Sequence, residues 1–124
     1  MTQEQKDLLL KDLCARLPYR VKVYDMKSSI NSSFMNLNHV NGAVGEVFIS
    51  YMNKCRTAPI EDVKPYLFPL SSMTEEHEKE WRYTLSSDGN ITYDTVDWCN
   101  ENHFDYRGLI PIGLAIDCTN LNIY

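Results

Sequence analysis

The chain has 124 residues, of which 44% are hydrophobic and 23% are charged, and this balance excludes a disordered or collagen-like protein. The net charge is −5, and residues 59–124 hold 12 acidic against 4 basic side chains. Because phosphate binding needs clustered cations, this acidity disfavours nucleic acid or an anionic membrane as the main partner. A chain of this size suits one domain, with no apolar run of the roughly 18 residues that a membrane span needs.

A helix is predicted over residues 2–17. Thr2 and Gln5 have the spacing of a capping box, in which the hydroxyl and the amide satisfy free N–H groups at a helix start. Leucines then recur on one face until Pro18 ends the run. The segment lacks the features of a secretory signal peptide.

Short strands are predicted next. Residues 20–24 alternate between polar and apolar, residues 28–33 have a loop composition, and residues 34–40 and 44–52 form a hairpin around Asn41-Gly42. The result is a three-stranded antiparallel meander. A helical turn at 60–63 and a short edge strand at 64–67, entered through Pro65, complete a small SH3-like barrel or curled sheet.

The remaining residues are predicted to be mainly helical. Thr74 is the expected N-cap of a surface helix with a narrow apolar stripe, and Asp94 or Thr95 the expected cap of a second helix that runs through His103. Residues 114–117 are predicted to add a final strand. We therefore expect an α+β fold in a single domain over 1–124, with a helix and small sheet over 1–70 and C-terminal helices packed on the sheet over 71–124.

Three segments carry a resemblance to a known family. They are QKDLLLKDLCARLPY (5–19), IEDVKPYLFPLSSMTEE (60–76) and VDWCNENHFDYRGLIPIGLAID (96–117). In these segments the chain resembles a family of small proteins of unknown function from gut-bacterial and phage-like genomes. The resemblance implies an accessory cytoplasmic protein and names no activity. The chain departs from the family pattern at His77, which is expected to weaken the helix cap, and at Pro111-Ile112, which disfavours a helix over 109–114.

The four cysteines predict free thiols in a reducing, cytoplasmic environment. They are widely spaced and contain no CxxC pair. Cys99 and His103 lie four positions apart on a predicted helix, so both can face one zinc ion. A zinc site needs two more ligands, which would have to come from Cys118, His77 or Asp105. We expect neither a metal nor another cofactor.

Three classes of function stay open. An enzyme of unknown class, which we rank third, needs Cys99 or Cys55 beside His39, His77 or His103, and no nucleophile-elbow pattern accompanies them. Nucleic-acid binding by a small barrel ranks second. Residues 33–42 (SFMNLNHVNG) resemble the first motif of Sm-like RNA-binding barrels. The second motif of that fold is an Arg-Gly pair on a late strand, whereas Arg107-Gly108 of this chain follows a predicted helix. The basic side chains available for it are Lys22, Lys27, Lys54 and Arg56.

The hypothesis that we prefer is a non-catalytic cytoplasmic module that binds another protein. Tyr66, Phe104, Tyr106 and Arg107 lie beside the rigid Pro65 and Gly108, and aromatic residues with Arg are typical of interface centres. We expect these four side chains to form or border one exposed patch. The alternatives are that the aromatics join the C-terminal helices to the sheet, and that Arg107 pairs with Asp105 within the chain.

Overall fold

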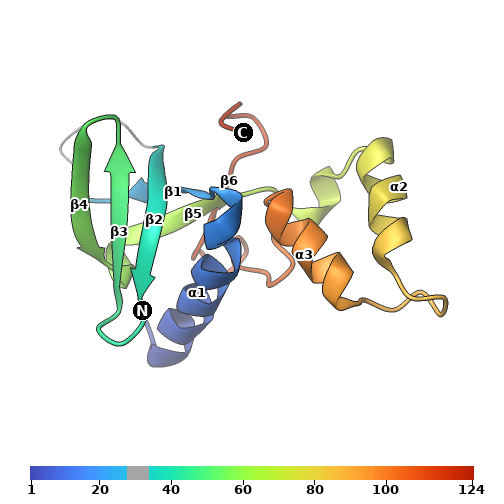
Figure 1. The fold of residues 1–124 in the computed structure, drawn as a ribbon, viewed down its shortest axis with the longest axis horizontal. Helices are drawn as coiled ribbons and strands as arrows, with labels where there is room; N and C mark the ends of the chain where they lie inside the picture. Colours follow the sequence, from blue (N-terminus) through green and yellow to red (C-terminus); the bar gives the residue numbers. More distant parts are fainter. Residues whose placement is uncertain (28–33) are drawn as a thin grey trace.

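The computed structural model describes residues 1–27 and 34–124, and it has the predicted α+β architecture (Figure 1). The loop predicted at 28–33 lies outside the described residues. Among the described residues, no helix is both long and apolar enough to span a bilayer. The elements in chain order are α1 (Gln3–Arg16), β1 (Lys22–Asp25), β2 (Met35–Asn41), β3 (Glu46–Tyr51), β4 (Lys54–Pro59), β5 (Val63–Leu67), α2 (Glu75–Thr84), α3 (Tyr93–Glu101) and β6 (Ile116–Asp117), with 3₁₀ turns at Leu17–Tyr19, Ile60–Asp62 and Leu70–Ser72.

The six strands form one mixed sheet in the order β4-β3-β2-β1-β5-β6. It is not closed into a barrel, so the curled-sheet form of the prediction is the correct one. The predicted meander gains a fourth strand, β4, which pairs with β3 from Tyr51 opposite Lys54 to Glu46 opposite Pro59. The prediction that β5 is an edge strand was wrong, because β1 pairs with it on one side and β6 runs parallel to it on the other.

The core lies between α1 and the inner face of the sheet. Thr2 and Gln5 make the predicted capping box, with hydrogen bonds of 3.0 and 3.1 Å, and so fix the start of α1. Leu9 and Leu13 are then fully buried against alternating strand residues such as Val23. Burying each of these aliphatic side chains stabilises the fold by roughly 1.5 to 3 kcal/mol, so α1 is an integral layer of the core.

Helices α2 and α3 form an arm beside the sheet, with α2 farthest from it (Figure 1). The expected weak cap of α2 was wrong, because Nδ1 of His77 accepts the Thr74 N–H at 3.2 Å and takes the place of the missing Glu. Helix α3 is capped by Thr92, not by Asp94 or Thr95, and it ends at Glu101 rather than His103. The hydroxyl of Thr92 also donates to the Thr84 carbonyl at 2.7 Å, which ties the two helices together.

Candidate functional site

The four residues of the predicted patch lie close to the C-terminal segment, but two of them are not at the surface. Tyr66 is 3% exposed and Phe104 is 1% exposed, whereas Tyr106 and Arg107 are half-buried. The ring of Phe104 stacks on Trp98 of α3 at 5.3 Å and also contacts Phe68, just after β5. Phe104 therefore joins the arm to the sheet, and Tyr66 and Phe104 offer no exposed aromatic surface. Partner binding by the four residues stays a prediction.

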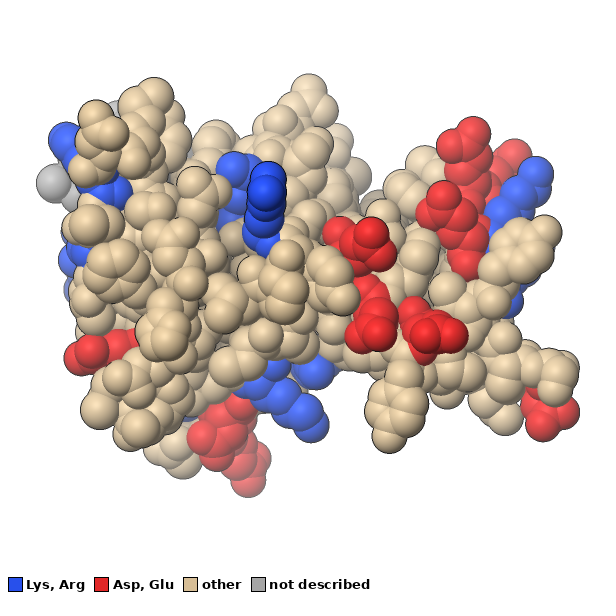
Figure 2. Space-filling view, in the orientation of Figure 1, with Lys and Arg blue, Asp and Glu red and all other residues tan. Residues whose placement is uncertain are grey.

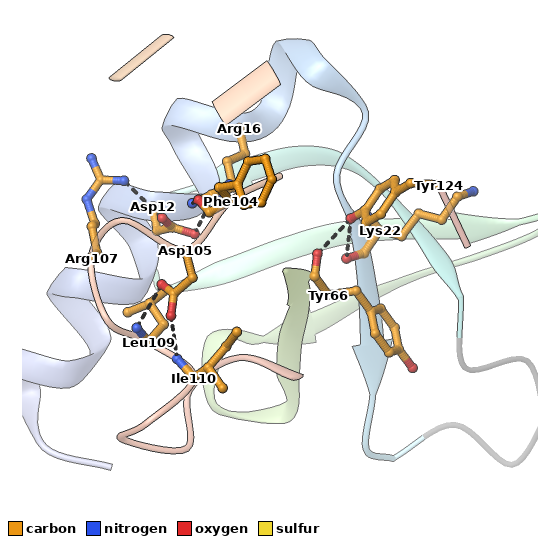
Figure 3. Close-up of polar contacts among 10 residues, drawn as sticks. All are labelled: Asp12, Arg16, Lys22, Tyr66, Phe104, Asp105, Arg107, Leu109, Ile110 and Tyr124. Atoms are coloured by element: carbon orange, nitrogen blue, oxygen red, sulfur yellow. Dashed lines mark hydrogen bonds and ion pairs between the residues drawn. The ribbon is translucent and has the colours of Figure 1, made fainter. Parts of the chain in front are cut away.

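Arg107 is paired with Asp12 of α1 rather than with Asp105 (Figure 3). Asp12 accepts from Nη1 of Arg107 on one carboxylate oxygen and from Nε of Arg16 on the other, both at 2.9 Å. Asp12 and Arg16 are completely buried, and Arg16 also donates to the Phe104 carbonyl at 2.6 Å. The i,i+4 spacing of Asp12 and Arg16 is visible in the sequence, whereas Arg107 reaches them only through the fold.

The ring of Tyr106 lies beside both guanidinium groups. Their central carbons are 5.4 Å (Arg16) and 4.6 Å (Arg107) from the ring centroid, within the range of cation–π attraction. Asp105, next to it, accepts the backbone N–H groups of Leu109 and Ile110 at 2.9 Å each (Figure 3). These contacts make the 104–110 segment a structural joint between α1, α3 and the sheet.

His103 and Tyr124 form a stacked pair that sequence reasoning did not identify. Their ring centroids are 3.6 Å apart. The Tyr124 hydroxyl accepts the Lys22 N–H at 2.8 Å and donates to the Tyr66 carbonyl at 2.9 Å, so it bridges β1 and β5 (Figure 3). Burial, followed by the positive charges of Arg16 and Lys22, lowers the pKa of His103 to about 4, and burial raises the pKa of Tyr124. At neutral pH the pair is therefore uncharged.

Cys99 and His103, the two candidate zinc ligands four positions apart, do not share a helix face. His103 lies beyond the end of α3 with φ +63°, so it does not continue the helical face that holds Cys99. In the described part of the chain, no group of three His, Cys, Asp or Glu side chains is placed to hold a metal ion. Burial raises the pKa of Cys99, which disfavours a reactive thiolate there.

The arm carries an exposed surface of a different kind. A hollow of about 270 Å³, which we call the arm groove, is lined by Leu70, Met73, Glu78, Trp81 and Arg82. Tyr83 of α2 is 90% exposed, and Tyr93, the first residue of α3, is 92% exposed. Acidic side chains gather over α2 and α3 in Figure 2. The arm thus combines apolar anchors with negative charge, whereas the sequence pattern had pointed to residues 103–110 as the exposed aromatic surface.

In comparisons with protein families, with curated proteins and with solved structures, no match to this chain was found. The expected relationship to a gut-bacterial and phage-like family stays a prediction. Functional inference consequently depends on the geometry of the chain itself.

Proposed function

We propose that this chain is a non-catalytic module that binds a basic segment of a partner protein through the α2–α3 arm. The observation that carries the proposal is that α2 contains no buried residue, although it is ten residues long. Isolated helices of this length are marginal in water, and packing normally stabilises them. Helix α2 packs on α3 and, through the half-buried His77, on Phe104, and this packing leaves Tyr83 and the arm groove exposed to a partner.

The composition of the arm indicates the chemistry of that partner. Tyr and Trp side chains combine an apolar ring with one polar group, and both residues are enriched in protein–protein interfaces. The arm groove is large enough for one aliphatic or aromatic side chain, and its lining includes Glu78, whose carboxylate lies 3.9 Å from the Arg82 guanidinium. The helices carry seven acidic residues against Lys79 and Arg82, so a partner with Lys or Arg next to its apolar anchor is complementary in charge. The acidic residues are Glu75, Glu76, Glu78, Glu80, Asp94, Asp97 and Glu101.

Two further observations support a cytoplasmic protein-binding role over nucleic-acid binding. All four cysteines are free, and Cys14 and Cys55 are exposed, which suits a reducing compartment. Arg56, one of the basic side chains available for a nucleic acid, is held by Asp25 at 2.6 Å and approaches Asp62 at 3.9 Å. A phage-like or mobile-element origin is part of the same proposal, and it rests on the sequence resemblance.

Selection of short peptides from a random display library tests the proposal. We expect the wild-type chain to enrich peptides with Lys or Arg beside a Leu, Phe or Trp. The variant Glu78→Lys reverses the charge of this groove-lining residue and should lose these peptides, whereas Glu46→Lys, an exposed acidic residue on β3, should retain them. Enrichment of acidic or purely apolar peptides, or equal enrichment by Glu78→Lys, would contradict the proposal.

A further inference from the structure

A second hollow, of about 610 Å³, lies between β1, β2 and the segment that ends at Tyr124. We call it the His103 hollow, since the stacked rings of His103 and Tyr124 form part of its wall. Its other polar lining comes from Tyr19, Arg20, Lys22, Asn36 and Asn38. The hollow is separate from the arm groove and shares no lining residue with it.

The charged side chains that line the His103 hollow are all basic. Arg20 and Lys22 are its cations, and its lining contains neither Asp nor Glu. Arg20 is exposed and makes no side-chain hydrogen bond or ion pair among the described residues. Within the described residues, the Lys22 ammonium donates one hydrogen bond, to the side-chain oxygen of Asn36 at 3.3 Å. Two cations so placed match a phosphate monoester, which carries about −1.5 to −2 at pH 7.

Neutral hydrogen-bonding groups accompany these cations. Nδ1 of His103 is buried and has no hydrogen-bond partner in the structure, although buried polar atoms are nearly always paired. The imidazole of His103 lines the hollow, and its lowered pKa means that it adds no charge there at neutral pH. Asn36 and Asn38 flank the buried Leu37 on β2, so both carboxamides lie on the same outer face of the strand.

The backbone around the hollow is unusual. Four non-glycine residues in the described chain have positive φ, and two of them, Arg20 (+58°) and His103 (+63°), line the hollow. A third, Asn122 (+52°), precedes the lining residue Ile123. Such conformations cost on the order of 1 to 3 kcal/mol each and cluster at ligand sites, where the surrounding structure enforces them.

We propose that the His103 hollow binds a small organic phosphate monoester, with Arg20 and Lys22 holding the phosphate and the partly exposed Leu17 and Ile123 receiving the organic body. The volume exceeds what an inorganic phosphate fills and lies within the roughly 300 to 1,000 Å³ of small-molecule sites. A longer nucleic acid is disfavoured, because the basic side chain of Arg56 is occupied by Asp25.

Titration calorimetry with four probes tests this inference: a nucleoside 5′-monophosphate, a hexose phosphate, inorganic phosphate and the unphosphorylated nucleoside. We expect at least one of the two esters to bind, inorganic phosphate to bind more weakly, and the nucleoside not to bind. Which ester binds more tightly distinguishes a planar base from a sugar as the organic body. Failure of both esters to bind at millimolar concentration, or equal binding of the nucleoside, overturns the proposal.

Two variants and a matched control locate the site. Arg20→Asn keeps a residue that tolerates positive φ, and Lys22→Gln keeps the backbone N–H that Tyr124 uses. Each should weaken ester binding by about tenfold, the effect of losing one charge-assisted hydrogen bond. Lys54→Gln, an exposed cation on β4, should leave it unchanged. Unchanged affinity in both hollow variants, or tighter binding of single-stranded RNA than of any ester, overturns the assignment.

Discussion

Oδ1 of Asp12 accepts a hydrogen bond from Nη1 of Arg107 at 2.9 Å, across 95 positions of the sequence. The same carboxylate holds Arg16 through its other oxygen. One buried acidic group therefore connects α1 to the 104–110 segment and neutralises part of the charge of two guanidinium groups. This arrangement assigns a structural role to Arg107, a residue whose sequence context favoured an interface.

Removing that carboxylate should destabilise the protein strongly. Asp12→Asn leaves the buried Arg16 without its counter-ion, and breaking a buried ion pair from one side costs about 3 to 5 kcal/mol. Urea unfolding should show this loss in the free energy of unfolding. Asp7→Asn, on the exposed side of α1, is the matched control and should change it by less than about 0.5 kcal/mol. A loss under about 1 kcal/mol for Asp12→Asn would contradict the structural role.

Two substitutions of Tyr106 separate its ring from its hydroxyl. Tyr106→Ala removes the ring beside Arg16 and Arg107 and should cost about 2 kcal/mol, less than for a fully buried aromatic. The hydroxyl is buried without a hydrogen-bond partner, so Tyr106→Phe should be neutral or slightly stabilising. Thermal unfolding measures both. A destabilised Tyr106→Phe would mean that the hydroxyl has a partner, for example a bound water.

The neutral state of His103 predicts a dependence of stability on pH. Its pKa falls from 6.5 to about 4 on folding, so below pH 6.5 the unfolded chain binds a proton that the folded chain does not. The contribution of the neutral His103 to the free energy of unfolding should be fully present above pH 6.5 and should decrease as the pH falls toward 4. Because the imidazole is only partly buried, we expect a loss on the order of 1 to 2 kcal/mol.

The variant His103→Asn isolates this effect, because Asn accepts positive φ and does not titrate. The difference in unfolding free energy between wild type and variant should decrease by about 1 to 2 kcal/mol when the pH is lowered from 7 to 4. A difference that stays constant across this range would show that His103 titrates normally in the folded protein.

The four thiols should divide into two pairs by reactivity. Cys14 and Cys55 are exposed, whereas Cys99 and Cys118 are buried. Burial and the charge of Asp117 raise the pKa of Cys118 to about 12, so it holds almost no thiolate at neutral pH. Titration with a thiol reagent should find two fast groups in native protein and four in denaturant. Fast reaction of more than two native groups would contradict the described burial.

Local features of the sequence predicted the local parts of the fold. Thr2, Gln5 and Pro18 delimit α1 because capping and the missing proline N–H act within a few residues. Strand β4 was missed because Lys54–Pro59 has a single buried residue, Ala58, and so no alternating pattern. The contact of Asp12 with Arg107 and the stack of His103 on Tyr124 depend on long-range packing, which residue spacing does not reveal.

The candidate surfaces were harder to predict for a related reason. The sequence alone does not distinguish a buried aromatic residue that joins two layers, such as Phe104, from an exposed aromatic residue, such as Tyr83. Only exposure separates them, at 1% against 90%. The patch expected around HFDYRGLI and KPYLFP was placed beside the rigid Pro65 and Gly108, whereas the highly exposed Tyr83 and Tyr93 lie on the arm.

The affinity of a selected basic peptide for the double variant Tyr83→Ser, Tyr93→Ser tests the arm proposal most directly. Both tyrosines are almost fully exposed, so the variant should keep the wild-type melting temperature. Met52→Ser is the control, because Met52 is 83% exposed on the turn between β3 and β4. We predict that the double variant binds the peptide at least tenfold more weakly, while the control binds as wild type does. Wild-type affinity in the double variant would contradict the assignment of the arm as the partner-binding surface.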